Sequence, residues 1–394
     1  MVSPTLVRKP VSGSTFPLMR TFFAVFIASL LLVALTSYGV WTEQRPVGHY
    51  LSDLRIELAV DDGQPGERGN LLGIEAQLFP ADYQSVARLH RKLAAYLEQA
   101  RGKGLLNDKT IVVLPEHVGT WLFASNEKNQ VYQATTIDEA MTWLSVSNPI
   151  KFLNAMLGAT GKDRLNDAYL RMKADSMASD YQTLFGGLAK EFGVTLVAGS
   201  IVLPDPHVTD GKLQVGNGPL FNSSLVFGSN GELIGQPQRQ MFPVSYLRGY
   251  IQSATDAPLN VVDTPAGRLG VLIGSDSWYP DNYERLNAAG AELVAVPAFV
   301  VGNGGWFKPW RGDLSATPGN PNPMQADSVT EGQAWQRLTL TRATQAGVSV
   351  FMHGQFWDQG SAGHSFVSRK GTQIMEPGLD DKARHGARLI NLWL

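Results

Sequence analysis

A short strand and the turn that follows it, at residues 270–280, constrain this chain more than any other segment. Gly270-Val271-Leu272-Ile273 is an apolar run, which ends in the polar turn Gly274-Ser275-Asp276 and an aromatic-proline step. A buried strand that ends in such a turn commonly holds a reactive side chain at the mouth of a pocket. The chain contains no cysteine. The turn therefore offers a hydroxyl and a carboxyl group, but no thiol.

The composition excludes several classes of function. With 394 residues, of which 44% are hydrophobic and 17% charged, the chain is long and apolar enough to bury a full core. A net charge of −2 argues against nucleic acid as a partner, because binding to phosphates needs clustered cations. The lack of cysteine excludes disulfides, cysteine-based zinc sites and thiolate catalysis. Seven scattered histidines without a His-x-x-x-His pair, and no glycine-rich phosphate loop, predict neither a metal nor another cofactor.

The N-terminal region is a separate module. Thr21–Thr42 contains no charged residue and is long enough to cross a bilayer as a helix. Arg8, Lys9 and Arg20 precede it, which by the positive-inside rule predicts a cytoplasmic amino end and an exported carboxyl-terminal domain. A cleaved signal peptide is the alternative, because Ser37–Gly39 offers small residues at suitable spacing. We favour a single-pass anchor.

Strand and helix patterns alternate from about Asp53 onward, which predicts one α/β domain. We therefore divide the chain into a cytoplasmic segment at 1–20, an anchor or signal segment at 21–42 and an α/β domain at 53–394. The pattern predicts strands at 54–60, 110–114, 194–198, 270–273, 292–296 and 348–352, helices at 86–97, 181–192, 281–289 and 335–345, and hairpins at 222–235 and 364–375. Asp82 is placed to cap the helix that begins near residue 86.

Two insertions interrupt this alternation near the predicted pocket. The first, at 118–171, carries a helix that Thr136 and Glu139 begin as a capping box, and an apolar stretch that includes Trp143 and Phe152. It is either extra core packing, a lid or a surface that contacts the membrane. The second, at 300–331, is rich in Gly, Pro and Asn and is too long for an ordinary connection, which indicates a functional flap or disorder.

Several motifs in their order along the chain resemble the nitrilase, or carbon–nitrogen hydrolase, superfamily. The motifs are Leu114-Pro115-Glu116, Asn222-Ser223-Ser224, Asn230-Gly231-Glu232, Met241-Phe242-Pro243, Gly270 to Pro280, Gly290-Ala291-Glu292-Leu293 before Val296-Pro297, Trp335 with Leu338, Arg342 and Ala343, and Gly363-His364-Ser365. The resemblance covers the chain from about Asp53 to its end. It implies a four-layer α-β-β-α sandwich, here preceded by one transmembrane helix, and it implies a homo-oligomer.

The resemblance also implies a Glu-Lys-Cys triad, of which only one member is present. In the family a thiolate attacks an amide or nitrile, a glutamate acts as general base and a lysine stabilises the developing oxyanion. The glutamate corresponds to Glu116. The spacing to Pro243 places the lysine at Gln238, and the cysteine falls on Gly274. The triad is therefore degenerate.

Other residues could replace the missing groups. Ser275 could act as nucleophile with Glu116 as base, although a turn serine usually bonds to the backbone. Arg239 or Arg248 could replace the lysine. The resemblance places His117, Asp276 and Trp278 in the pocket.

The sequence thus predicts a membrane-anchored, exported carbon–nitrogen hydrolase-like domain without the thiol activity of its family. Its expected role is to bind a small amide or carboxylate ligand, or to act as an assembly partner. The alternative is an amidase or N-acyltransferase that acts on C–N bonds with Ser275 as nucleophile.

Overall fold

The computed structural model of the protein describes residues 16–46, 51–310, 328–340, 346–375 and 385–394. The chain divides into two compact units, Met1–Arg45 and Pro46–Leu394. Each unit is described separately below.

The first unit contains one long helix, α1 (Phe16–Glu43). Met19–Glu43 is long and apolar enough to cross a membrane, judged by length and composition. Two of its hydroxyl groups are satisfied within the helix, because Ser29 and Thr36 donate to the carbonyls of Val25 and Leu32. Such internal bonds are what an apolar environment requires of polar side chains.

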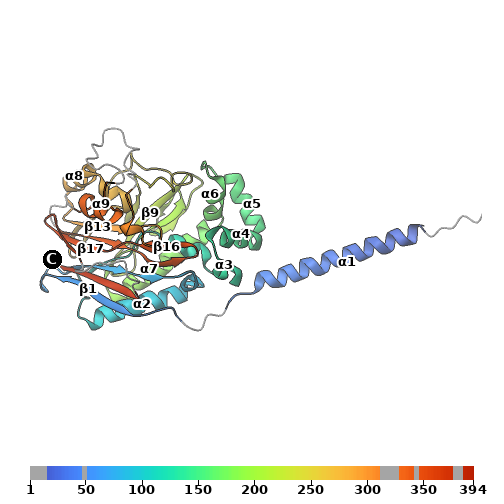
Figure 1. Ribbon diagram of the computed structural model, residues 1–394, viewed down its shortest axis with the longest axis horizontal. Coiled ribbons are helices and arrows are strands. Elements are labelled where there is room, and N and C mark those ends of the chain that lie inside the picture. Colours follow the sequence, from blue (N-terminus) through green and yellow to red (C-terminus); the bar gives the residue numbers. More distant parts are fainter. Residues whose placement is uncertain (1–15, 47–50, 311–327, 341–345, 376–384) are drawn as a thin grey trace, which may run out of the picture. The chain divides into compact units, whose positions relative to one another are not determined.

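Two β-sheets form the centre of the second unit (Figure 1). The strands of the first sheet follow the order β1-β19-β2-β4-β5-β9-β10, with β6 paired to β9; those of the second follow β11-β12-β13-β14-β17-β18. The bounds in the first sheet are β1 (Ile56–Asp62), β2 (Asn70–Glu75), β4 (Ile111–Val113), β5 (Thr195–Val197), β6 (Ile201–Pro204), β9 (Leu220–Phe227), β10 (Leu233–Arg239) and β19 (Ala387–Trp393). Those in the second are β11 (Val261–Thr264), β12 (Gly267–Val271), β13 (Leu293–Ala298), β14 (Ala346–Phe351), β17 (Phe366–Arg369) and β18 (Thr372–Met375).

The two sheets pack face to face through aliphatic side chains. Leu71 and Val113 of the first sheet share one buried cluster with Leu269 and Val348 of the second. Gly73 in β2 lets the sheets approach, because a Cβ at this position would lie 2.7 Å from Val350. The inner strands are apolar on both faces, as expected of strands buried between layers.

Helices cover the outer faces of both sheets and complete the four layers. The helices α2 (Val86–Gly102) and α7 (Ala174–Phe192) cover the first sheet; α8 (Pro280–Ala288) and α9 (Glu331–Leu338) cover the second. The predicted four-layer α-β-β-α sandwich is confirmed. Small pairings add β3 (Gln77–Leu78) with β15 (His353–Phe356) and β16 (Gln359–Ala362), and β7 (His207–Thr209) with β8 (Lys212–Gln214).

The first insertion folds into four short helices at one end of the domain (Figure 1). They are α3 (Asn129–Gln133), α4 (Ile137–Ser147), α5 (Pro149–Gly158) and α6 (Arg164–Arg171). Thr136 caps α4, as predicted, but the carboxylate of Glu139 accepts from the backbone N–H and the hydroxyl of Thr135, so the predicted capping box is formed only in its Thr136 half. Of the second insertion, residues 311–327 lie outside the described residues.

Two predicted helix ends differ from the structure. The helix predicted at 335–345 ends at Leu338, since Thr339 is extended and Leu340 has a φ of +61°; residues 341–345 lie outside the described residues. Helix α2 is capped by Ser85 instead of Asp82. The carboxylate of Asp82 is instead buried against the ammonium group of Lys92, at 2.9 Å.

Candidate functional site

Glu116 follows strand β4 and lies in the interior, with 4% of its surface exposed. Its Oε1 accepts hydrogen bonds from Nδ2 of Asn222, at 2.9 Å, and from Nε2 of Gln240, at 3.3 Å. The backbone N–H of Phe299 also donates to this carboxyl group. All three donors are neutral amides.

Gly274 lies directly against Glu116. It begins the turn after β12 with a φ of +51°, in the left-handed region that favours glycine. A Cβ at this position would lie 2.6 and 2.9 Å from the two carboxyl oxygens of Glu116. The carboxyl group therefore fills the space that a side chain at position 274 would need, and the structure brings these two predicted positions together.

The contact predicted for Gln238 is made by Gln240. Gln240 donates to Glu116 and, at 3.1 Å, to the carbonyl of Ile273. The hydrogen bonds of Gln238 run elsewhere: its Oε1 accepts from the backbone of Asn260 and its Nε2 donates to the carbonyl of Arg239. Strand β10 ends at Arg239, so the next side chain, that of Gln240, turns toward Glu116. A signal for this residue was present in the sequence: Gln240 is a second glutamine, two positions after Gln238 along the extended chain.

The two arginines considered as substitutes for the lysine are bound to other groups. Arg239 pairs with Asp205 at 2.8 Å and stacks over the ring of Phe221. Nε of Arg248 donates to the carbonyl of Pro243. Neither geometry directs a cation toward Glu116.

Ser275 is nearly buried, and its hydroxyl donates to the carbonyl of Phe242. The acceptor lies 33 positions away in the sequence, so this bond joins two segments and is not the bond to its own backbone that is usual for a turn serine. A nucleophilic serine would instead give its proton to a general base. The hydroxyl proton of Ser275 is directed away from that role.

Asp276 fastens the turn to the segment that follows β10. Its carboxyl oxygens accept from the backbone N–H groups of Met241, at 3.0 Å, and Phe242, at 2.7 Å. Burial raises the pKa of Asp276 to about 7, although these N–H groups favour the ionised form. Asp276 therefore holds the backbone of the site in place.

The protonation of Glu116 follows from its surroundings. Burial, and then the nearby charge of Asp276, raise the pKa of Glu116 to about 8; the amide donors of Asn222 and Gln240 lower it only in part. At neutral pH the carboxyl group is thus mainly protonated. A general base must be ionised, so Glu116 is poorly prepared for that role.

His117 joins this buried group to a cavity. Its φ is +63°, an uncommon conformation for a residue other than glycine. Its Nε2 lies 3.8 Å from Oε1 of Glu116, and its Nδ1 lies 3.2 Å from the hydroxyl of Thr120. Burial lowers the pKa of His117 to about 4. Since Glu116 is protonated and His117 neutral near pH 7, the two form no ion pair.

The cavity beside His117 has a volume of about 280 Å³. The first insertion forms part of its wall, through residues of α4 and α6 such as Met141 and Leu170. The remaining wall is largely aromatic, with Trp121, Tyr250 and Phe299 among the lining residues. An apolar cavity with a few polar groups is typical of small-molecule sites.

Trp278 lies in the core behind the second sheet, away from this cavity. Its ring packs edge-on against Trp335, with 5.0 Å between the ring centroids, and it belongs to the cluster that α8 and α9 cover. Of the three residues expected in the pocket, the structure places His117 at the cavity, Asp276 at the backbone of the site and Trp278 in the core.

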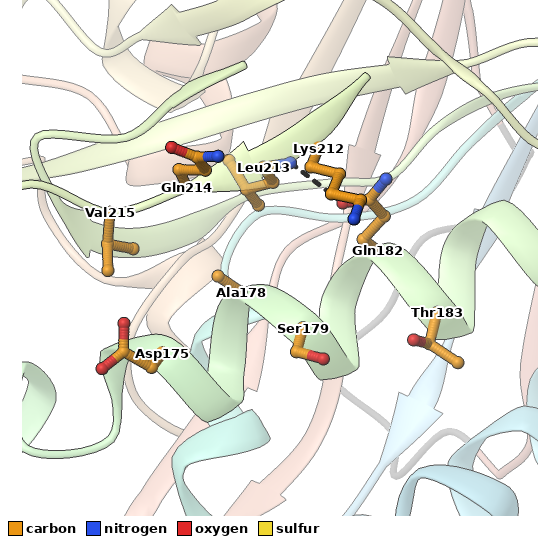
Figure 2. A pocket seen from close by; sticks show the side chains of 9 residues that line it. All are labelled: Asp175, Ala178, Ser179, Gln182, Thr183, Lys212, Leu213, Gln214 and Val215. Carbon is orange, nitrogen blue, oxygen red and sulfur yellow. Dashed lines mark hydrogen bonds between the residues drawn. The ribbon is translucent and has the colours of Figure 1, made fainter. Parts of the chain in front are cut away.

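A larger hollow of about 650 Å³ lies between α7 and the β7–β8 hairpin (Figure 2). Gln182 bridges it, because its side chain accepts from the backbone of Leu213 and donates to the carbonyl of Gly211. Its lining residues include none of the predicted site residues. Within the described part of the chain, no three His, Asp or Glu side chains are grouped to hold a metal ion.

Comparison with known proteins identifies the class. The model of the carbon-nitrogen hydrolase family matches residues 77–352. The chain belongs to this family.

Among individual relatives, the deaminated glutathione amidase of Yersinia enterocolitica is 30% identical over 173 residues. This match covers 41% of the present chain and 54% of that enzyme, about half its length. Two solved variants of the amidase from Nesterenkonia sp. AN1, of the nitrilase superfamily, are similar at 13% identity over 84% of this chain. The matches cover 92% and 93% of those chains, with TM-scores of 0.47 and 0.48.

Proposed function

We propose that this protein is a membrane-anchored carbon–nitrogen hydrolase-like domain that lacks the family's thiol chemistry and binds a small neutral ligand. The observation that carries the proposal is the position of the Glu116 carboxyl group. It fills the space that a nucleophilic side chain at Gly274 would occupy. The neutral amide of Gln240 beside it supplies no cation.

The magnitude of these losses supports a non-catalytic role. Removing one oxyanion donor costs about 3–4 kcal/mol in known hydrolases, and removing a nucleophile lowers the rate about a millionfold. Both groups are missing here, and Glu116 is mainly protonated near pH 7. Ser275 offers no replacement while its hydroxyl is bound to Phe242.

The charges around the cavity favour a neutral amide over a carboxylate as ligand. His117 is neutral at physiological pH, and Asp138 is an acidic residue of the lining. A carboxylate would therefore enter without a cation from the lining residues, which carry no lysine or arginine. Aromatic walls and the Asn166 side chain suit a small amide.

An activity assay tests the loss of catalysis. The full chain is incubated in detergent with acetamide, butyramide and benzamide, and released ammonia is measured. We expect none above the blank. Turnover that disappears in Ser275→Ala would overturn the proposal and establish the amidase or N-acyltransferase alternative.

Ligand binding is tested with two tryptophan substitutions on the same helix. Leu170→Trp fills the cavity, whereas Leu165→Trp lies at an exposed position of α6. We expect small amides to shift the melting temperature of the native chain and of Leu165→Trp, but not of Leu170→Trp. Equal shifts in both variants, or none in the native chain, would contradict binding in this cavity.

Membrane anchoring is tested by fractionation. We expect the protein to stay in the membrane fraction through an alkaline wash. A reporter that is active only outside the cytoplasm, fused after Leu394, should be active. Release of a soluble species with a new N-terminus near Val40 would establish a signal peptide instead.

A further inference from the structure

We infer that helix α5 of the first insertion lies in the surface of a lipid bilayer with anionic headgroups. Three large apolar side chains of this helix are exposed: Ile150 at 75%, Leu153 at 62% and Leu157 at 76%. Their spacing of three and four residues places them on one face of the helix. We call Ile150, Leu153 and Leu157 the α5 patch.

The opposite face of α5 is already used for packing. Phe152 stacks on Tyr169 of α6, with 5.1 Å between the ring centroids, and Ala155 is buried in a small cluster with Ala168. The helix is therefore apolar on two sides, one of which meets solvent. Contiguous exposed apolar surface on a folded domain usually marks an interaction site.

Neighbouring apolar residues extend the patch. Val146 at the end of α4 is 44% exposed, and Leu165 in α6 is 49% exposed. In the ribbon view, α5 lies at the outer edge of the insertion helices (Figure 1). The patch is thus presented by the outermost helix of this end of the domain.

The surrounding charges favour a membrane over a protein partner. The exposed charged side chains of α5 and of the segment from α5 to the start of α6 are Lys151, Lys162 and Arg164, all cations. The exposed acids of the insertion helices in this region, Asp138 and Glu139, stand in the first turn of α4. An interfacial helix with an apolar face and flanking cations is suited to anionic lipids.

The proposed anchor would hold this surface close to a bilayer. Eight residues, 44–51, stand between the end of α1 at Glu43 and Ser52, whose hydroxyl is bonded to Asp82 of the domain. Eight residues reach about 28 Å at full extension, so a domain tethered by α1 meets the membrane at high effective concentration. In this respect the inference rests on the proposed membrane anchoring.

The absence of cysteine makes a direct test possible. Single cysteines are introduced in the full chain as Leu153→Cys in the α5 patch, Leu30→Cys in α1, and Glu98→Cys at an exposed position of α2. Each is labelled with an environment-sensitive fluorophore. The proteins are reconstituted in phosphatidylcholine–phosphatidylglycerol vesicles, with and without acyl-chain spin-labelled lipid as quencher.

We expect quenching at position 153 to exceed that at position 98 by at least about threefold, as for a side chain inserted below the headgroups. Adding Ile150→Ser and Leu157→Ser should reduce the quenching at 153 to the level at 98. Quenching at 30 but not at 153 would overturn the inference and leave the anchor intact. Quenching at 153 but not at 30 would support the α5 contact and contradict the anchor.

Two further outcomes would also overturn the inference. One is equal, low quenching at 153 and 98 regardless of the result at 30. The other is a blue-shifted but unquenched fluorophore at 153 whose shift grows with protein concentration, which would identify a second copy of the chain as the occupant.

Discussion

The buried group around Glu116 and the cavity beside it share His117 but differ in the functional groups that they contain. The buried group contains a turn with a φ of +51° at Gly274 and a carboxyl group, Asp276, that fixes the facing backbone. It has no thiol, and the cation that acts on it, Arg285, interacts with Asp276 and not with Glu116. The cavity has open volume, aromatic walls and a covering insertion.

This comparison distinguishes the backbone scaffold of a site from the side chains that would react in it. Backbone geometry at Gly274 and the hydrogen bonds of Asp276 depend on residues that are present, so the site is still assembled. Reactivity depends on two side chains that are absent, at position 274 and beside Glu116. Under the proposed function, this site keeps its shape while its thiol chemistry is lost.

The largest effect is expected from removing the carboxyl group that supports the turn. Asp276→Ala leaves the N–H groups of Met241 and Phe242 buried without an acceptor, which costs about 3–5 kcal/mol of the free energy of unfolding. Asp281→Ala, an exposed position in the first turn of α8, should cost less than about 1 kcal/mol. Urea unfolding of the full chain measures both. Equal costs would show that Asp276 does not support the scaffold.

The next largest effect is expected from reintroducing the two missing side chains of the triad, a cysteine and a lysine. In Gly274→Cys the Glu116 carboxyl must move, and the left-handed backbone costs about 1–2 kcal/mol. Adding Gln240→Lys places a cation near the thiol and should raise its alkylation rate about tenfold, because the cation favours the thiolate. Adding Gln238→Lys instead is the matched control and should leave the rate unchanged.

The outcome of this pair decides between two positions for the missing lysine. The native chain has no cysteine, so an alkylating reagent reports only the introduced thiol. A faster reaction with Gln238→Lys than with Gln240→Lys would contradict the assignment of Gln240 to the site.

A smaller effect is expected from the protonation of Glu116. Its pKa is about 8 in the fold and 4.5 in the absence of the fold. Between these values the unfolded chain releases the proton that the folded chain retains, so the stability contribution falls as pH rises and levels off above pH 8. Glu116→Gln replaces the titrating carboxyl group with a neutral amide, and so removes this loss of stability at high pH.

Thermal unfolding at pH 5 and pH 8.5 measures the change. Relative to the native chain, Glu116→Gln should gain on the order of 1–3 kcal/mol between the two pH values. The exposed Glu98→Gln should gain none. A native chain whose stability rises over this interval, with no gain in Glu116→Gln, would show that Glu116 is ionised.

The smallest effect is expected at Ser275. Ser275→Ala loses one hydrogen bond to the carbonyl of Phe242, which costs about 1 kcal/mol. Ammonia release from amides should be at the blank level before and after the change. A catalytic difference between the two proteins would place Ser275 in a working site.

Local patterns in the sequence predicted most of the fold, because strands and helices here follow apolar periodicity. Strands β4 and β9 and helix α2 lie where the pattern placed them. The pattern failed at two places where contacts outside the local segment determine the structure. Asp82 is bound to Lys92, and Leu340 adopts a left-handed conformation where a helix was predicted.

The candidate site could be predicted from the sequence only in part. Glu116 and Gly274 were assigned through the family resemblance, from motifs that follow strands, and the structure places the two in contact. Gln240 was missed because the spacing to Pro243 carries no information about where strand β10 ends. The pairing of β10 with β9 also shifts between Ile234 and Gln238. The cavity is lined by residues from seven separate chain segments, and no local pattern describes such a surface.

The central claim, that a formed site lacks its nucleophile, is tested most directly by the mass of the intact protein. The full chain is incubated with acyl-donor amides and esters, quenched in acid and weighed, with Gly274→Cys/Gln240→Lys beside it. The account predicts an unmodified mass for the native chain. An acyl adduct on the native chain that is absent from Ser275→Ala would contradict it.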